Sequence, residues 1–83
     1  MNIHDLETFL AAADLLHFGQ ASRACNLSPS ALTRSIQRLE DEFGQPLFER
    51  KTRAVELTDA GAILQRRAEE VVRLIDDTKA QIA

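Results

Sequence analysis

The chain has 83 residues, 45% of them hydrophobic and 28% charged, and a net charge of −3 at pH 7. This composition is typical of a globular domain and excludes a disordered chain, while the length supports one small domain with little core to spare. A single cysteine excludes an internal disulfide, and the longest uncharged apolar run, Phe9 to Ala13, is too short to cross a membrane. We therefore expect a cytoplasmic protein that gains stability from a partner chain.

The negative net charge argues at first sight against a nucleic-acid partner, because proteins that neutralise phosphates usually carry surplus cations. The cations are unevenly spread, however, and five of them lie in the middle third of the chain: Arg34, Arg38, Arg50, Lys51 and Arg53. Acidic residues share this stretch, and the sequence leaves open whether they lie on other faces.

The first third of the chain predicts two helices. Apolar residues recur at intervals of three and four from His4 to Leu16 and predict an amphipathic helix, with Asn2 as its cap. A second, short helix is expected from Gln20 to Cys25, with Ala21 and Ala24 buried where two helices cross closely. A tight turn follows, as in a helix-turn-helix.

The third helix has sharp start and stop signals. Ser28 can cap free backbone N–H groups, and Pro29 suits the first helical position, where a missing donor costs nothing. Gly44 suits the left-handed conformation just past a helix end. We expect a helix over Pro29–Phe43. Its buried face is expected to comprise Leu32, Ile36, Leu39 and Phe43.

The last third predicts a wing and a long helix. Residues 47–50 and 55–57 are expected to form two short strands joined by residues 51–54. Thr58 can cap a final helix from Asp59 to the chain end, and Gly61 suits close packing of that helix on the wing. The helix carries a heptad seam for dimerisation: Leu64, Ala68, Val71, Ile75, Thr78 and Ile82. The chain ends in the middle of this pattern at Ala83, so we expect a piece of a longer protein.

The polar face of the third helix is the main functional candidate. The short side chains of Ser30 and Thr33 allow a close approach to the major groove. Arg34 can donate two hydrogen bonds to a guanine edge, and Gln37 can pair with adenine. An isolated helix with such a face is usually only solvated, but the preceding turn and the following wing favour DNA binding.

Contacts with the DNA backbone are expected from the cap, the second arginine of the third helix and the wing tip. These residues are Ser28, Arg38, Lys51, Thr52 and Arg53. Arg53 also suits a narrow minor groove, where the negative potential is enhanced. The soft metal-ligand candidates, His4, His17 and Cys25, match no zinc motif, so we expect no metal, no cofactor and no enzymatic activity in this domain.

Motifs along the chain resemble the N-terminal domain of LysR-type transcriptional regulators. They are Leu6-x-x-Phe9, Phe18-x-x-Ala21, Leu27-Ser28, Ala31-Leu32-Thr33, Ile36-x-x-Leu39-Glu40, Phe43-Gly44, Pro46-Leu47-Phe48-x-Arg50 and Leu57-Thr58-x-Ala60-Gly61. The resemblance covers residues 3–61. It implies a mainly α fold, with a winged helix-turn-helix over residues 1–58 (a three-helix core plus a short β-hairpin wing) and a linker/dimerisation helix over residues 59–83.

The resemblance also implies roles for individual residues. Carried over by position, the residues facing bases are Pro29, Ser30, Thr33 and Arg34; those at or near the backbone are Ser28, Gln37, Arg38 and Arg50; and Arg53 reaches the minor groove. Two positions depart from the family pattern. Pro29 stands where the family often has Gln, which removes a base-reading amide, and Thr33 replaces the commoner Ser, which adds a methyl group that can touch thymine.

For partners, the resemblance implies double-stranded DNA and a homodimer formed by antiparallel linker helices, with a tetramer in the full-length protein as a further option. It also implies an effector-binding domain, absent from this chain, that would bind a small-molecule inducer. An alternative stays open: a winged-helix module for protein contact, with the last helix as its working surface. The negative net charge is the best support for that alternative.

Overall fold

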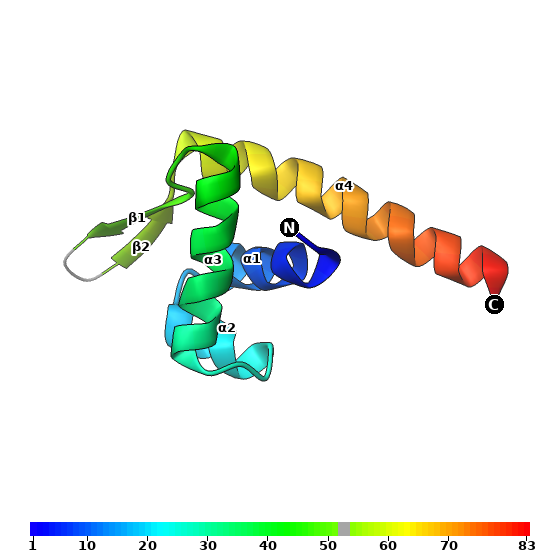
Figure 1. Ribbon diagram of the computed structural model, residues 1–83, viewed down its shortest axis with the longest axis horizontal. Coiled ribbons are helices and arrows are strands. Elements are labelled where there is room, and N and C mark those ends of the chain that lie inside the picture. Colours follow the sequence, from blue (N-terminus) through cyan, green and yellow to red (C-terminus); the bar gives the residue numbers. More distant parts are fainter. Residues whose placement is uncertain (52–53) are drawn as a thin grey trace.

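The computed structural model describes residues 1–51 and 54–83, so that Thr52 and Arg53, both predicted at the wing tip, lie outside the described residues. The elements are α1 (Ile3–Leu15), α2 (Phe18–Ala24), α3 (Pro29–Phe43), β1 (Phe48–Lys51), β2 (Ala54–Leu57) and α4 (Asp59–Ile82). Figure 1 shows α1 to α3 packed together, with the antiparallel β1–β2 hairpin on one side and α4 running away on the other. This order confirms the predicted mainly helical fold with a hairpin wing.

Side-chain caps set the predicted helix starts. Asn2 Oδ1 accepts a hydrogen bond from Asp5 N at 2.9 Å, Ser28 Oγ accepts one from Ala31 N at 3.1 Å, and Thr58 Oγ1 accepts one from Gly61 N at 3.0 Å. These bonds satisfy backbone donors that lack a partner in the first helical turn. All three predicted caps are therefore confirmed.

The ends of the first two helices differ from the prediction. The helix α1 ends at Leu15 because Leu16 adopts the left-handed conformation, with φ of 50°. The helix α2 begins at Phe18, two residues earlier than predicted, because His17 Nδ1 accepts a hydrogen bond from Gln20 N at 3.0 Å and caps it. Histidine is not among the preferred cap residues, so the sequence pattern did not reveal this start.

The core lies between α1, α2, α3 and the hairpin base. Its largest fully buried side chains are Phe9, Leu32, Leu39 and Leu47. Phe48 of β1 joins the hairpin to this core, because its ring lies 5.4 Å from that of Phe9 and 5.2 Å from that of Phe18. Such aromatic contacts keep a short hairpin in place that would not persist alone.

Two residues predicted to be buried are exposed. In α2 the buried pair is Ala21 and Ser22, and this direction of burial leaves Ala24 on the outer side of the helix. Phe43 is 46% exposed because it occupies the end of α3, one turn beyond Leu39, the last buried residue of the helix. With Ile63 of α4, which is 55% exposed, it lines an apolar groove of 270 Å³.

The start of α4 is joined to the base of the wing. Thr58 Oγ1 donates to the carbonyl oxygen of Pro46 at 2.7 Å, and Thr58 N donates to that of Leu47 at 3.1 Å. A Cβ atom at Gly61 would collide with the Leu47 carbonyl oxygen. The predicted close packing of Gly61 is thus confirmed, and it brings α4 tightly against the chain that enters β1.

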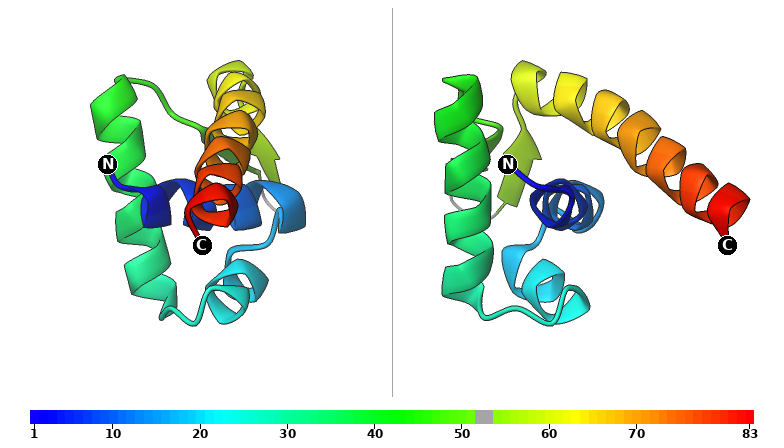
Figure 2. Two further views of the ribbon diagram at one scale, coloured as in Figure 1. Left: turned by 90° about the vertical axis from the view of Figure 1, so that its right-hand side faces the viewer. Right: turned by 45° about the vertical axis from the view of Figure 1, so that its right-hand side comes forward.

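Only the first part of α4 packs on its own domain. Ala68 is 1% exposed within the single chain and Leu64 is half-buried against the same core, so the start of the predicted dimer seam packs within the protomer. The other seam residues, from Val71 on, are exposed, and the dimer interface stays a prediction. The rest of α4 leaves the domain, as the right-hand view in Figure 2 shows, and gives the molecule extents of 46 × 25 × 19 Å. No helix within residues 1–51 and 54–83 is both long and apolar enough to span a membrane.

Candidate nucleic-acid interface

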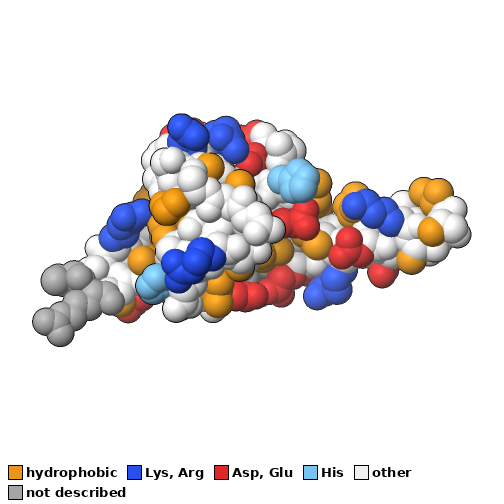
Figure 3. All heavy atoms as spheres, turned by 90° about the horizontal axis from the view of Figure 1, so that it is seen from below, with side chains coloured by type: hydrophobic (Ala, Val, Ile, Leu, Met, Phe, Trp, Pro, Cys, Tyr) orange, Lys and Arg blue, Asp and Glu red, His pale blue; other side chains and the backbone are white. Residues whose placement is uncertain are grey.

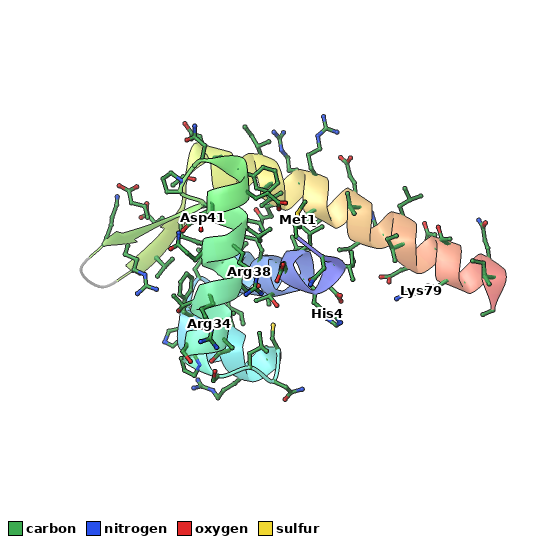
Figure 4. All side chains as sticks on the ribbon, viewed as in Figure 1. Met1, His4, Arg34, Arg38, Asp41 and Lys79 are labelled. Carbon is green, nitrogen blue, oxygen red and sulfur yellow. The ribbon has the colours of Figure 1, made fainter. Side chains whose placement is uncertain are left out.

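The helix α3 presents a polar face away from the core. It packs inward through Leu32, Ser35, Ile36 and Leu39. The residues predicted to contact DNA from this helix are all exposed: Pro29, Ser30, Thr33, Arg34, Gln37 and Arg38. In Figure 4, Arg34 lies nearer the start of α3, Arg38 lies farther along beside α1, and Asp41 lies toward the other end of the helix.

The start of α3 is rich in hydroxyl groups that already have local partners. Ser28 Oγ caps the helix and lies 3.3 Å from Ser30 Oγ. Thr33 Oγ1 donates to the carbonyl oxygen of Pro29 at 3.0 Å. The side chains at this end of the helix are therefore short and held by local hydrogen bonds. Such side chains allow the helix backbone to approach a base-pair edge closely, but they do not extend far from the helix.

Arg34 is the arginine of α3 with the greatest freedom to bind a ligand. Its side chain is exposed, and among the described residues it forms no ion pair. It lines a groove of 630 Å³ between the start of α1, the turn after α2 and the side of α3. A guanidinium in this position keeps all of its donors available for bidentate contact.

Gln37 has a partner within the helix. Its Nε2 donates to Asp41 Oδ1 at 3.0 Å, one helical turn farther on. Both side chains are exposed, so the bond is weak in water and the amide can exchange it for another partner. Reading adenine would require that exchange.

Arg38 is held by a residue that the sequence did not bring into the site. Its Nη2 donates to Asp5 Oδ1 at 2.9 Å, and the same oxygen accepts a hydrogen bond from Ser35 Oγ at 2.9 Å. Burial of Asp5 opposes its ionisation, but hydrogen bonds from Arg38, Ser35 and Asn2 together with the Arg38 charge outweigh this effect and lower the pKa of Asp5. The carboxylate is ionised at neutral pH.

The described part of the wing carries two further cations. The Arg50 guanidinium lies 4.7 Å from the centroid of the Phe18 ring, a cation–π contact that fixes it beside α2. Lys51 Nζ lies 3.3 Å from Glu56 Oε2 on the opposite strand. Both side chains are exposed, and Thr52 and Arg53, which follow them, lie outside the described residues.

Charge along α3 runs against the helix dipole. Acids stabilise a helix start and cations stabilise a helix end, by about 0.3–1 kcal/mol each. The helices α1 and α4 have Asp5 and Asp59 in their first turns, but α3 has no acid in its first turn and no cation in its last. Its acids lie near its end, where Glu40 Oε2 accepts a hydrogen bond from Leu47 N at 2.7 Å. The positive start of α3 is thus left open to an outside anion.

Figure 3 shows the surface from the α2 side, where Lys and Arg side chains are spread over the winged-helix part and both acidic and basic side chains lie along α4. Among the acids of the middle third, Glu40, Asp41 and Glu42 lie in the second half of α3, so they do not cover its start. Within the described part of the chain no three His, Cys, Asp or Glu side chains are grouped so that they could hold a metal ion.

Sequence comparison relates the chain to a family of regulators. Residues 3–62 match the family described as bacterial regulatory helix-turn-helix protein, lysR family. The chain is 50% identical over 72 residues to the HTH-type transcriptional regulator IlvY of Escherichia coli strain K12, an overlap that covers 87% of this chain and 24% of that protein. The chain thus spans about a quarter of the length of the curated relatives it matches.

Solved structures with the same fold include complexes with DNA. The structure of BenM DBD with catB site 1 DNA matches 99% of this chain and 91% of that chain, with a TM-score of 0.94 and 28% identity. Vibrio fischeri DarR in complex with DNA matches 99% of this chain and 28% of that chain, with a TM-score of 0.93 and 34% identity. The chain belongs to the lysR family of bacterial regulatory helix-turn-helix proteins.

Proposed function

We propose that this chain is the DNA-binding domain of a transcriptional regulator that acts in the cytoplasm and binds double-stranded DNA as a homodimer. The observation that carries the proposal is the exposed start of α3, where Arg34 has no ion pair among the described residues and no acid occupies the first turn. Two solved structures with this fold are described as complexes with DNA, which supports the same role.

In this proposal α3 lies in the major groove and reads bases with its first turns. Arg34 contacts a guanine edge, while Ser30 and Thr33 sit close to the base pairs beside it. Pro29 contributes shape rather than hydrogen bonds, and Gln37 contacts a base only after leaving Asp41. Specificity at this end of the helix therefore depends mainly on Arg34.

Contacts with the DNA backbone surround the reading helix. Ser28 and Arg38 flank the base contacts on α3, and Arg50 and Lys51 are placed on the wing. Thr52 and Arg53 at the wing tip complete the proposed set, with Arg53 at the minor groove. These contacts position the domain without reading sequence.

The dimer is proposed to form through the free part of α4. Val71 and Ile75 are 44% and 39% exposed, Thr78 is also exposed, and Ile82 is 81% exposed, which leaves an apolar strip without a partner in the single chain. An apolar strip of this kind on a projecting helix is typical of a coiled-coil partner surface.

Charge favours an antiparallel arrangement of the two helices. Arg66 and Arg67 lie in the first half of α4, and Asp76 and Asp77 lie in the second. A twofold axis near Val71 sets these arginines level with the partner's aspartates along the pair, whereas a parallel pair would set like charges level with each other. The same arrangement brings the end of the partner's helix toward the groove at Phe43 and Ile63. An effector domain, an inducer and a tetramer in the full-length protein are further parts of the proposal.

A titration with duplex DNA at several salt concentrations tests the proposal against the protein-contact alternative. We expect affinity to fall steeply with salt, with a slope of about 0.9 for each neutralised phosphate. Arg38→Ala is expected to reduce that slope by about 1 per protomer and to weaken all DNA sequences alike. Binding that is absent, or that is indifferent to salt and to this substitution, would contradict the proposal and favour protein contact.

A further inference from the structure

The Asp5 carboxylate on α1 is buried and fully engaged with the reading helix. It is 4% exposed, and its Oδ1 accepts two side-chain hydrogen bonds, from Ser35 Oγ and Arg38 Nη2, each at 2.9 Å. Its Oδ2 lies 3.3 Å from the N–H of Asn2 and completes the cap of α1. The carboxylate is therefore fixed from three sides and cannot turn without breaking bonds to both helices.

Arg38 contacts this carboxylate through one nitrogen of its guanidinium, Nη2. Its side chain is 59% exposed, and it lines the same groove of 630 Å³ as Arg34. A guanidinium has five N–H donors in a rigid plane, so a bond on one nitrogen fixes the direction of the others. Figure 4 shows Arg38 beside α1, one helical turn along α3 from Arg34.

A carboxylate in the groove beside these arginines would weaken DNA binding if its negative charge were its only effect. The groove that holds Asp5 also holds Arg34 and Arg38, the two arginines of α3 proposed to meet DNA. A carboxylate there repels phosphates and cancels part of the attraction of its neighbours. The carboxylate can favour binding in another way, by holding an arginine in place. A long arginine side chain loses much conformational freedom on binding, and a side chain that is already held loses less.

We propose that Asp5, together with Ser35, is a positioning residue that holds the Arg38 guanidinium in the orientation required to contact a DNA phosphate. This inference rests on the proposed function. Asp5 does not touch DNA itself; it acts through Arg38, from a helix 33 residues away in sequence. The depressed pKa of the carboxyl agrees with a charge that is kept ionised for this task.

The substitution Asp5→Asn separates positioning from charge, because the two effects have opposite signs. If Asp5 acts by charge alone, removing it strengthens DNA binding. If it positions Arg38, removing it weakens binding, by about 3- to 10-fold. The matched control is Glu7→Gln, since Glu7 is an exposed acid on the same helix that lines the same groove. We expect this control to bind DNA as tightly as the unchanged protein, or more tightly.

A double-mutant cycle with Arg38→Ala tests that the effect passes through the arginine. In the Arg38→Ala background, Asp5→Asn is expected to cause no loss of affinity, although a merely structural defect would persist there. Circular dichroism checks that each variant is folded. If Asp5→Asn fails to fold, Ser35→Ala takes its place, because it keeps the charge and removes one bond that orients the carboxylate; we expect about a 2-fold loss that also requires Arg38.

The outcomes are distinguishable. Equal or tighter binding by Asp5→Asn, or an equal loss with and without Arg38, overturns the positioning role and leaves DNA binding intact. Failure of the unchanged protein to bind DNA overturns the proposed function itself.

Discussion

Replacing Val71 and Ile75 together by aspartate is expected to convert the protein from a dimer into a monomer and to lower its affinity for a two-half-site DNA by about 100-fold or more. Both side chains are exposed in the single chain, so the protomer should tolerate the change. In the proposed antiparallel pair the two new carboxylates at position 71 would lie against each other and those at position 75 would be buried against the partner helix, and buried unpaired charges are strongly destabilising. Sedimentation gives the mass, and a DNA titration gives the affinity.

The new aspartates also repel DNA by their charge alone, whether or not the dimer is lost. The control must therefore add the same charge to α4 and leave the apolar strip unchanged. Ala62→Asp combined with Ala80→Asp meets this need, since both alanines are exposed on α4 away from the strip. We expect this control to remain a dimer and to lose little affinity. A Val71→Asp, Ile75→Asp protein that sediments as the unchanged dimer would place the interface elsewhere.

Arg34→Ala is expected to cost about 1–3 kcal/mol for each half-site, or roughly 5- to 150-fold in affinity, and to relax the base preference at one position. The structure gives the physical reason: among the described residues Arg34 has no ion pair, so all of its donors are free for a guanine edge. Because both protomers lose the contact, the effect on a dimer should be larger than on one half-site. Competition with DNA variants at each position measures both effects.

Arg23→Ala is the matched control for this prediction. Arg23 is an exposed arginine in the last turn of α2, so its loss changes the net charge by the same amount. We expect it to weaken all DNA sequences slightly and alike. Base reading by Arg34 would be refuted if Arg34→Ala lost no more affinity than Arg23→Ala and kept every base preference.

The parts of the fold that were predictable are those with local signals. The bounds of α3 match the prediction because Ser28, Pro29 and Gly44 act within a few residues of the helix ends. The start of α2 was missed because a histidine cap gives no recognisable sequence signal. Helix ends were thus predictable wherever the type of one residue determines the conformation of the backbone next to it.

The parts that were not predictable depend on contacts across the fold. The sequence pattern of α4 describes one apolar seam, and only the structure shows that Ala68 is buried within the single chain whereas Val71 is exposed. In the same way, Asp5 reads as a residue of a helix start, and its pairing with Arg38 arises only when α1 packs on α3. The exposed face of α3 could be predicted; the neighbours that orient its side chains could not.

Selection of bound sites from random duplex DNA tests the central claim most directly, because it examines base reading and dimer symmetry together. The proposal predicts two inverted half-sites whose centres lie about one helical turn, or a multiple of it, apart, each with a guanine whose enrichment disappears in Arg34→Ala. Recovery of no enriched sequence, or of a single half-site without an inverted partner, would contradict it.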